Sequence, residues 1–557
     1  MKLPNLFRTD LINIHHAAFW LAFFSCISAI LGLFRDRMLA SIFGAGRSLD
    51  IYYSAFRIPD FLYTLMLFFA ASTVIIPIFL TDYKDNKQNA EKLFGSVLFF
   101  FFIVIFILGL AAFIFMKIFM NRFLPGFSTN ELEQAVLLSR IMLLSPLFLG
   151  LSNILSSITQ AFRRFFIYAL SPVLYNIGII IGILFFLPRF GLAGLALGVA
   201  LGAMLHVSIQ ILSIFQVGLM PRWGGFWNED LRRVLLLSFP RALGLATTQI
   251  TIIIFTGVAS TIAAGSISIF NFASNLQAIP VTLIGLSYSV AAFPNLTEYA
   301  ISGATEQFKK HFSIAFRHII FWAFPFSILL MVLRAQIIRV ILGAGKFNWT
   351  DTRLTAAALF LLSLAIILQS LFMLLVRAFY AENQTMRPLV INIVSAGLSI
   401  GAVFWFTKIL SNTSFFLYFV KWSLHLQDIT DIRVLALPMG ILAGSFINCV
   451  FLLIAFAIVF KWAPWIGSER AILKIVASGL GGGGVAYGAL NIFSHIFNLT
   501  KFTGIFAQGL FSGLIGLLAT VSMLWVLKSE ELTELYSGMK GILWTHHVPT
   551  PEPEKLP

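Results

Sequence analysis

Long apolar runs separated by short polar segments make up most of the chain. Fourteen of these runs are long enough for an α-helix that crosses a membrane, which needs about 20 residues. They lie near residues 14–42, 51–82, 90–120, 131–162, 166–188, 191–217, 230–261, 266–298, 308–341, 352–380, 386–409, 434–461, 468–495 and 503–528. The pattern predicts an all-α polytopic membrane protein with about fourteen transmembrane helices.

The composition also indicates a membrane protein and excludes a soluble one. Of the 557 residues, 59% are hydrophobic and 11% are charged, whereas about 25% are charged in a typical soluble domain. Cys26 and Cys449 lie inside apolar runs, so we expect no disulfide framework. Residues 1–16 lack the pattern of a cleaved signal peptide, and we expect none.

The positive charges are concentrated in every second loop. The net charge is +15, and short cytoplasmic loops collect Lys and Arg, so we interpret the excess as topology rather than as a nucleic-acid site. The basic residues of these loops are Lys84, Lys87, Lys92, Arg163, Arg164, Arg222, Arg232, Arg233, Lys309, Lys310, Lys461, Arg470 and Lys474. Both termini are therefore predicted to be cytoplasmic. The tail, residues 531–557, is predicted to be disordered.

A weak repeat relates the two halves of the chain. The first copy contains Ala161, Phe162, Pro172 and Asn176, and the second contains Ala378, Phe379, Pro388 and Asn392. Six predicted helices separate equivalent residues, so the two copies have the same orientation in the membrane. Parallel repeats of this kind occur in transporters, whose substrate site lies between the halves.

The repeat predicts two six-helix lobes, residues 1–217 and 218–462. The two apolar runs within residues 463–530 fall outside it. Prolines inside helical runs of both halves predict kinks and favour a bundle that rocks. The glycine-rich run at residues 478–488 lacks the lysine of a phosphate-binding loop, and we favour close helix packing as its role.

Four arginines lie inside apolar runs, where a charge is energetically costly. They are Arg35, Arg57, Arg140 and Arg241, and the nearest acidic residues are Asp36 and Asp50. An excess of buried cations favours an anionic ligand, and Arg suits phosphate because its guanidinium binds two oxygens at once. We therefore predict a substrate-binding cavity lined by Arg35, Asp36, Asp50, Arg57 and Arg241.

Structural alternatives stay open for these charges. Arg35 could pair with Asp50, or the arginines could extend to the membrane surface. For Arg140 we favour a structural role of one of these two kinds. The sequence contains no HExxH, CxxC or Walker motif. We expect a protein that is not an enzyme and has no cofactor or metal.

The stretch GLFRDRMLASIFGAGRSLDIYYSAFRIPDFL, from Gly32 to Leu62, resembles the N-terminal signature of the MurJ (MviN) lipid II flippases of the MOP exporter superfamily. The segment RAFYAENQTMRP, from Arg377 to Pro388, is similar to a second motif of that family. The resemblance extends over nearly the whole chain. It implies two six-helix lobes around a cationic cavity, and a groove for a lipid tail formed by the last two helices.

The resemblance implies a flippase that moves lipid II, or a related polyprenyl-diphosphate-linked precursor, across a bacterial inner membrane. It implies the lipid-linked oligosaccharide and membrane lipids as partners, with cell-wall synthesis proteins as further candidates. Coupling to the membrane potential or to a monovalent ion stays open. Arg35 matches a cavity arginine of the family.

The sequence departs from the family pattern at several expected cavity cations. Ala29, Tyr63, Thr64 and Asn275 stand where the family commonly has arginine. Arg241, on another helix, is a candidate to compensate. Two alternatives follow: an exporter of the same superfamily with another cargo, or a membrane scaffold with a degenerate cavity that transports nothing.

Overall fold

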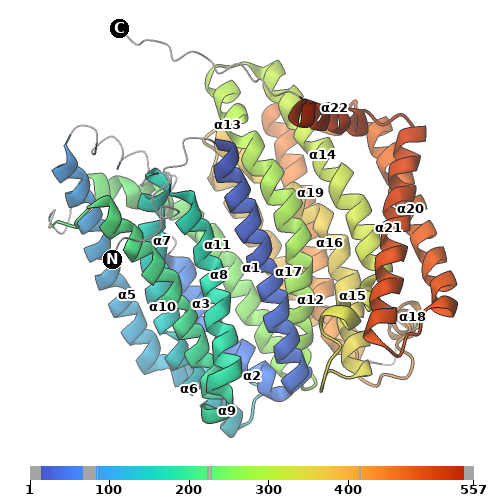
Figure 1. The fold of residues 1–557 in the computed structure, drawn as a ribbon, viewed down its shortest axis with the longest axis horizontal. Helices are drawn as coiled ribbons and strands as arrows, with labels where there is room; N and C mark the ends of the chain where they lie inside the picture. Colours follow the sequence, from blue (N-terminus) through green and yellow to red (C-terminus); the bar gives the residue numbers. More distant parts are fainter. Residues whose placement is uncertain are drawn as a thin grey trace. The chain divides into compact units, whose positions relative to one another are not determined.

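The computed structural model of the protein describes residues 14–66, 79, 83, 86–162, 164–222, 225, 229–412 and 415–544. These described residues form α-helices joined by short connections, with no β-strand among them (Figure 1). Twelve helical segments in this part of the chain are long and apolar enough to cross a membrane. The all-α polytopic membrane fold is confirmed.

The twelve candidate spans correspond to the third to fourteenth helices predicted from hydropathy. The first predicted helix is present as α1 (Ile14–Phe43). The second begins as α2 (Arg47–Ala55) and α3 (Arg57–Met66), and most of its remainder lies outside the described residues. The count of fourteen spans therefore stays a prediction.

The next helices correspond to the third to seventh predicted helices and to the first half of the eighth. They are α5 (Lys87–Phe123), α6 (Thr129–Met142), α7 (Leu144–Ala161), α8 (Phe165–Ile181), the π-helix η2 (Gly182–Phe186), α9 (Leu187–Phe190), α10 (Leu192–Val217), α11 (Glu229–Ser260) and α12 (Ser266–Pro280). Pro280 ends α12, and a π-helical turn, η3 (Val281–Leu286), follows it directly. This is the irregularity that a proline inside a helix produces, because it removes one backbone hydrogen bond.

The chain after η3 continues with long helices and two short ones. They are α13 (Ser287–Ile301), α14 (Thr305–Val332), α15 (Arg334–Ile341), α16 (Trp349–Ala381), α17 (Met386–Ser411), α18 (Phe415–Ser423), the 3-10 helix η4 (Arg433–Leu435), α19 (Ala436–Phe460), α20 (Glu469–Ile496), α21 (Phe502–Val526) and α22 (Glu530–Trp544). Of these, α18 has nine residues and is too short to cross a bilayer.

The chain divides into two compact units. Unit 1 contains residues 1–279, 338–362 and 385–448, and unit 2 contains residues 280–337, 363–384 and 449–557. Unit 1 includes helices from both predicted lobes. The lobe boundaries at residues 217 and 462 stay a prediction.

Unit 1 carries equivalent contacts in the two copies of the sequence repeat. The Asn176 amide on α8 donates to the Ser28 carbonyl of α1 at 3.3 Å, and the Asn392 amide on α17 donates to the Gly244 carbonyl of α11 at 3.4 Å. Each pair is 148 residues apart in sequence. Asn392 is 216 residues after Asn176, and Gly244 is 216 residues after Ser28. One offset therefore relates the two contacts.

The glycine-rich run of α20 packs closely within unit 2. A side chain at Gly482 would meet the Thr520 hydroxyl and the Gly516 carbonyl of α21, and one at Gly479 would meet the Phe324 ring of α14. The absence of a Cβ lets these helices approach closely. The prediction that this run serves helix packing is confirmed.

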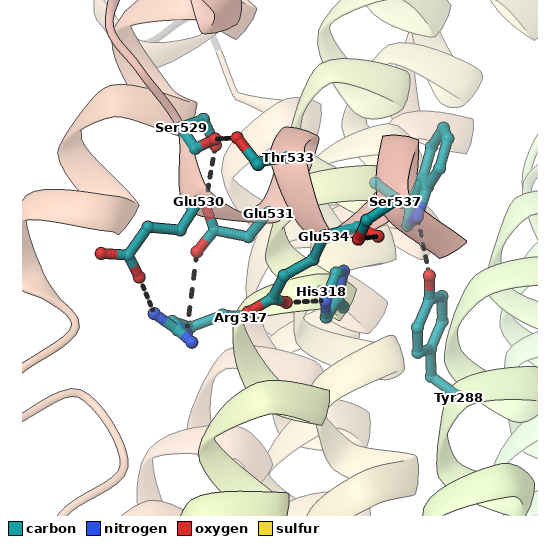
Figure 2. A network of polar contacts seen from close by, with 10 residues as sticks. Tyr288, Arg317, His318, Ser529, Glu530, Glu531, Thr533, Glu534 and Ser537 are labelled. Atoms are coloured by element: carbon teal, nitrogen blue, oxygen red, sulfur yellow. Dashed lines mark hydrogen bonds and ion pairs between the residues drawn. The ribbon is translucent and has the colours of Figure 1, made fainter. Parts of the chain in front are cut away.

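Helix α22 packs on α14 through a polar network in unit 2 (Figure 2). Arg317 donates to Glu530 at 3.0 Å, and its Nε lies 3.7 Å from the buried Glu531 carboxylate. The neighbouring His318 contacts Glu534 at 2.9 Å. The expectation of disorder is therefore wrong for residues 531–544, because three glutamates on one face of a helix find two basic partners. Residues 545–557 lie outside the described residues.

Candidate polar binding site

Arg35 and Asp36 lie together near the end of α1. The Arg35 guanidinium donates to Asp36 Oδ1 from Nη2 at 2.8 Å and from Nε at 3.0 Å. Its Nη1 donates to the Asn176 side-chain oxygen on α8 at 3.3 Å. Asp36 is 4% exposed, and Arg35 is eight residues, or about 12 Å along the helix axis, before the last residue of α1. The pair is therefore held inside the apolar part of the protein.

Helix α12 presents a polar face to α1, α2 and α3. Ser268, Asn271 and Asn275 follow the i, i+3, i+7 spacing that places side chains on one face of a helix. The Asn275 amide donates to Asp36 Oδ2 at 3.0 Å, and Arg57 Nη2 donates to the Asn271 oxygen at 2.9 Å. One helix face thus connects two predicted site residues.

We call this group the α12 polar cluster. It consists of Arg35, Asp36, Asp50 and Arg57 on α1–α3 and Ser268, Asn271 and Asn275 on α12. Four of the five predicted site residues belong to it. Sequence reasoning missed Ser268 and Asn271, and it noted Asn275 as a departure from the family pattern. The helical spacing of the three residues was the signal that would have found them.

Arg57 is the cation of the cluster with unused hydrogen-bonding capacity. It is the first residue of α3, because a break at Phe56 separates α2 from α3. Its Nε is buried without a hydrogen-bond partner. Among the described residues, no carboxylate oxygen lies within 4.0 Å of its nitrogens, and Asp60, one turn further along α3, is partly exposed. A buried donor of this kind is available to a ligand.

Asp50 has a different role from the arginines. Its carboxylate accepts hydrogen bonds from the Gly265 amide at 2.6 Å, the Ser268 amide at 2.8 Å and the Ser268 hydroxyl at 2.7 Å. These amides belong to the start of α12, where backbone N–H groups lack partners inside the helix. In the described part of the chain Asp50 therefore caps α12, and Arg35 pairs with Asp36 rather than with Asp50.

The two remaining arginines are not placed in the cluster. Arg140 donates to the Phe113 carbonyl at 3.1 Å, and its guanidinium lies 4.7 Å from the centre of the Phe113 ring. Arg140 therefore has structural contacts with Phe113 of α5. Arg241 lies on α11, but its side chain is outside the described residues.

The turn between α1 and α2 packs against two other connections of unit 1. The Ala45 amide donates to Asp351 at 3.2 Å, and the Lys346 amide donates to the Ser41 carbonyl at 2.8 Å. Gly44 (φ +64°) and Gly265 (φ +91°) have left-handed backbones, and a Cβ on either would collide with a carbonyl, of Lys346 and Ala45 respectively. The backbones of three connections therefore meet at one end of unit 1.

The cluster consists of side chains that form hydrogen bonds and ion pairs. It offers guanidinium, amide and hydroxyl groups beside the Asp36 and Asp50 carboxylates, and the described residues contain no group of three or more His, Cys, Asp or Glu that could hold a metal ion. A diphosphate is a suitable ligand for such donors, since hydrogen bonds between guanidinium and phosphate oxygens are charge-assisted and strong.

Comparisons with known proteins identify the family. A family model described as "Lipid II flippase MurJ" matches residues 39–415. The protein named "Probable lipid II flippase MurJ" from Buchnera aphidicola subsp. Acyrthosiphon pisum is 32% identical over 372 residues, which cover 65% of this chain and 72% of that protein.

Two solved structures share the fold. One is titled "Lipid II flippase MurJ, inward closed conformation" (TM-score 0.70, 24% identity, 91% of this chain and 99% of that chain). The other is an inward-facing multidrug resistance MATE family transporter of the MOP superfamily (TM-score 0.62, 16% identity, 78% of this chain and 94% of that chain). The family match covers more than half of the chain, and the chain therefore belongs to the MurJ lipid II flippase family.

Proposed function

We propose that this protein moves lipid II, or a closely related polyprenyl-diphosphate-linked peptidoglycan precursor, from the inner to the outer leaflet of a bacterial inner membrane. The observation that carries the proposal is Arg57, a cation inside a membrane protein with a buried Nε that lacks a partner. Membership of the MurJ family supports the choice of cargo. The diphosphate would supply the acceptors that Arg57 lacks.

In the α12 polar cluster, some residues would bind the head group and others would position the residues that bind it. Arg57, and Arg35 after a small rotation away from Asp36, would bind phosphate oxygens. Asn271 and Asn275, bonded to Arg57 and Asp36, orient the charged side chains. Asp50 fixes the start of α12, and it thereby fixes the position of the Asn271 and Asn275 amides along the helix axis.

The contacts of the α1–α2 turn fit a closed outer side. The predicted topology puts this turn, the connection before Gly265 and the connection around Lys346 on the outer face, and all three touch. In alternating access these contacts would separate to release the cargo outward. The motion would be a rocking of residues 1–217 against 218–462, with both termini cytoplasmic.

The remaining features follow from the chemistry of flipping. No covalent bond is made or broken, so the protein would act as a transporter and not as an enzyme. The membrane potential or a monovalent ion would supply the driving force, without a cofactor. Helices α20 and α21 would receive the lipid tail, and cell-wall synthesis proteins would be the further partners.

Complementation tests the proposal with a matched pair of arginines. In a strain depleted of its own lipid II flippase, we expect the wild-type protein and Arg140→Ala to restore growth and Arg57→Ala to fail at equal membrane levels. Full growth with Arg57→Ala would favour the scaffold alternative. Failure of the wild-type protein itself would favour another cargo.

A further inference from the structure

Helix α18 is a short helix in the connection between the eleventh and twelfth predicted helices. Its nine residues span about 14 Å, less than half of the roughly 30 Å of a bilayer core. It is therefore not a transmembrane segment. Its sequence, FFLYFVKWS, is nevertheless among the most aromatic of the chain.

Four of the five aromatic residues of α18 form one exposed face. Phe415, Tyr418, Phe419 and Trp422 follow the i, i+3, i+4, i+7 spacing of one side of a helix, and they are 87%, 64%, 51% and 68% exposed. A soluble protein rarely leaves so continuous an apolar surface uncovered. The opposite side packs inward, where Val420 is buried and Phe416 stacks on Phe406 of α17 at 6.1 Å.

The segment after α18 fixes the helix in this orientation. His425 has a left-handed backbone (φ 58°) that ends the helix. Leu426, Ile429 and Ile432 are buried. Arg353 at the start of α16 donates to the His425 carbonyl and, at 2.6 Å, to Asp428. The exposed aromatic face thus belongs to an anchored element rather than to a loose loop.

We propose that α18 is an interfacial helix whose aromatic face docks on phospholipid at the membrane–water boundary. Trp and Tyr favour that boundary, since each has an apolar ring and a polar group. Phe404 and Trp405 are likewise exposed, on the candidate span α17 that precedes α18 in the chain. The loop that follows α18 is polar at Gln427 and Asp428, which are exposed, as expected for a part in water.

The end of unit 1 that carries α18 is the end where the α1–α2 turn lies. Asp351 bonds to that turn and Arg353 bonds to the α18 loop, and both belong to the first residues of α16. The proposed orientation places this end in the outer leaflet. Docking of α18 would hold the outer end of α17 at a fixed depth.

A spin label at the edge of the aromatic face, one turn beyond Phe419, tests the docking without removing an aromatic residue. Ser423 is exposed and lies one turn after Phe419, whereas Gln427 is exposed in the polar loop. The chain has two cysteines, so Ser423→Cys and Gln427→Cys can each be made in a Cys26→Ser, Cys449→Ser background. Each variant is labelled with a nitroxide in vesicles of phosphatidylethanolamine and phosphatidylglycerol.

Collision with two relaxing agents then reports the environment of each label. We expect apolar oxygen to relax the label at 423 more effectively than the water-soluble nickel chelate, and the reverse at 427. Strong relaxation by the nickel chelate at both positions would overturn the proposal. So would protection of 423 from both agents, which would indicate a protein partner or a second copy. A reversed topology would change the leaflet and leave the result at 423 intact, so it is distinguishable.

Discussion

The two copies of the repeat use the same asparagine in different surroundings. In the first copy Asn176 bonds to the α1 backbone and accepts a hydrogen bond from Arg35. In the second, Asn392 bonds to the α11 backbone and accepts one from the neutral Asn448 amide at 3.2 Å. The offset of 216 residues places Thr251 where the first copy has Arg35, and the Thr251 hydroxyl bonds to its own helix at Thr247.

This difference distinguishes contacts that maintain the fold from a charge that is available for binding. The asparagine joins two helices in both copies, so that contact belongs to the scaffold of the repeat. The charge is present in one copy only, and a charge inside a membrane protein is too costly to be kept without a use. We infer that Arg35 serves the cargo and that Asn176 and Asn392 serve the fold.

The largest expected effect comes from removing the charge that distinguishes the copies. Arg35→Ala should lower the rate of lipid II flipping by about tenfold or more, because a hydrogen bond to a charged group contributes about 1.5–3 kcal/mol. Thr251→Ala, at the equivalent position, should leave the rate nearly unchanged. A similar loss for both variants, measured at equal membrane levels, would remove the distinction between the copies.

The second expected effect concerns the shape of the cation at position 57. Arg57→Ala should abolish most transport, and Arg57→Lys should restore part of it, since Lys keeps the charge but lacks the planar group that binds two oxygens. The measurement is the flipping rate of each variant in the same membranes. Full activity of Arg57→Lys would show that charge alone is sufficient.

A smaller effect is expected when either asparagine is replaced. These two variants compare the two copies of the repeat most directly. Asn176→Ala and Asn392→Ala should each lower the free energy of unfolding by about 1 kcal/mol, the usual contribution of a hydrogen bond. Asn176→Ala should also lower transport severalfold, because Arg35 loses a partner. Thermal unfolding in detergent measures the first quantity and flipping measures the second. Equal transport in the two variants would contradict the assignment.

The smallest effect is expected where a cation already has carboxylate partners. Arg317 contacts Glu530 and Glu531, and Glu530 is largely exposed, so the Glu530→Gln change should cost less than about 1 kcal/mol of stability. Transport should not change. Loss of flipping in this variant would mean that α22 takes part in the transport cycle.

Hydropathy predicted the helices well because lipid-facing helices need long apolar runs whatever their partners. It missed the helix α22, since the proline-rich end of the chain dominated the interpretation of the whole tail. It also missed α18, which is too short to register as a span. Both are stabilised by tertiary contacts, such as Arg317 with Glu530 and Arg353 with Asp428, that the local sequence does not show.

The charged residues of the candidate site could be predicted from the sequence, and its asparagines could not. Arg35, Asp36 and Arg57 are conspicuous because charges are rare in apolar runs. Asn271 is an ordinary residue in sequence, and Asn275 was noted because it replaces a family arginine. The contacts of both join residues that are more than 200 positions apart in sequence. Asp50 was identified as a site residue, but only the structure shows that its carboxylate caps α12.

The most direct test of the central claim uses purified protein in vesicles that contain fluorescent lipid II in one leaflet. We predict that the wild-type protein and Thr251→Ala transfer the lipid to the other leaflet, as seen by its accessibility to an impermeant quencher. The double variant Arg35→Ala, Arg57→Ala should transfer none above protein-free vesicles while folding normally. Transfer by the double variant at the wild-type rate would contradict the account.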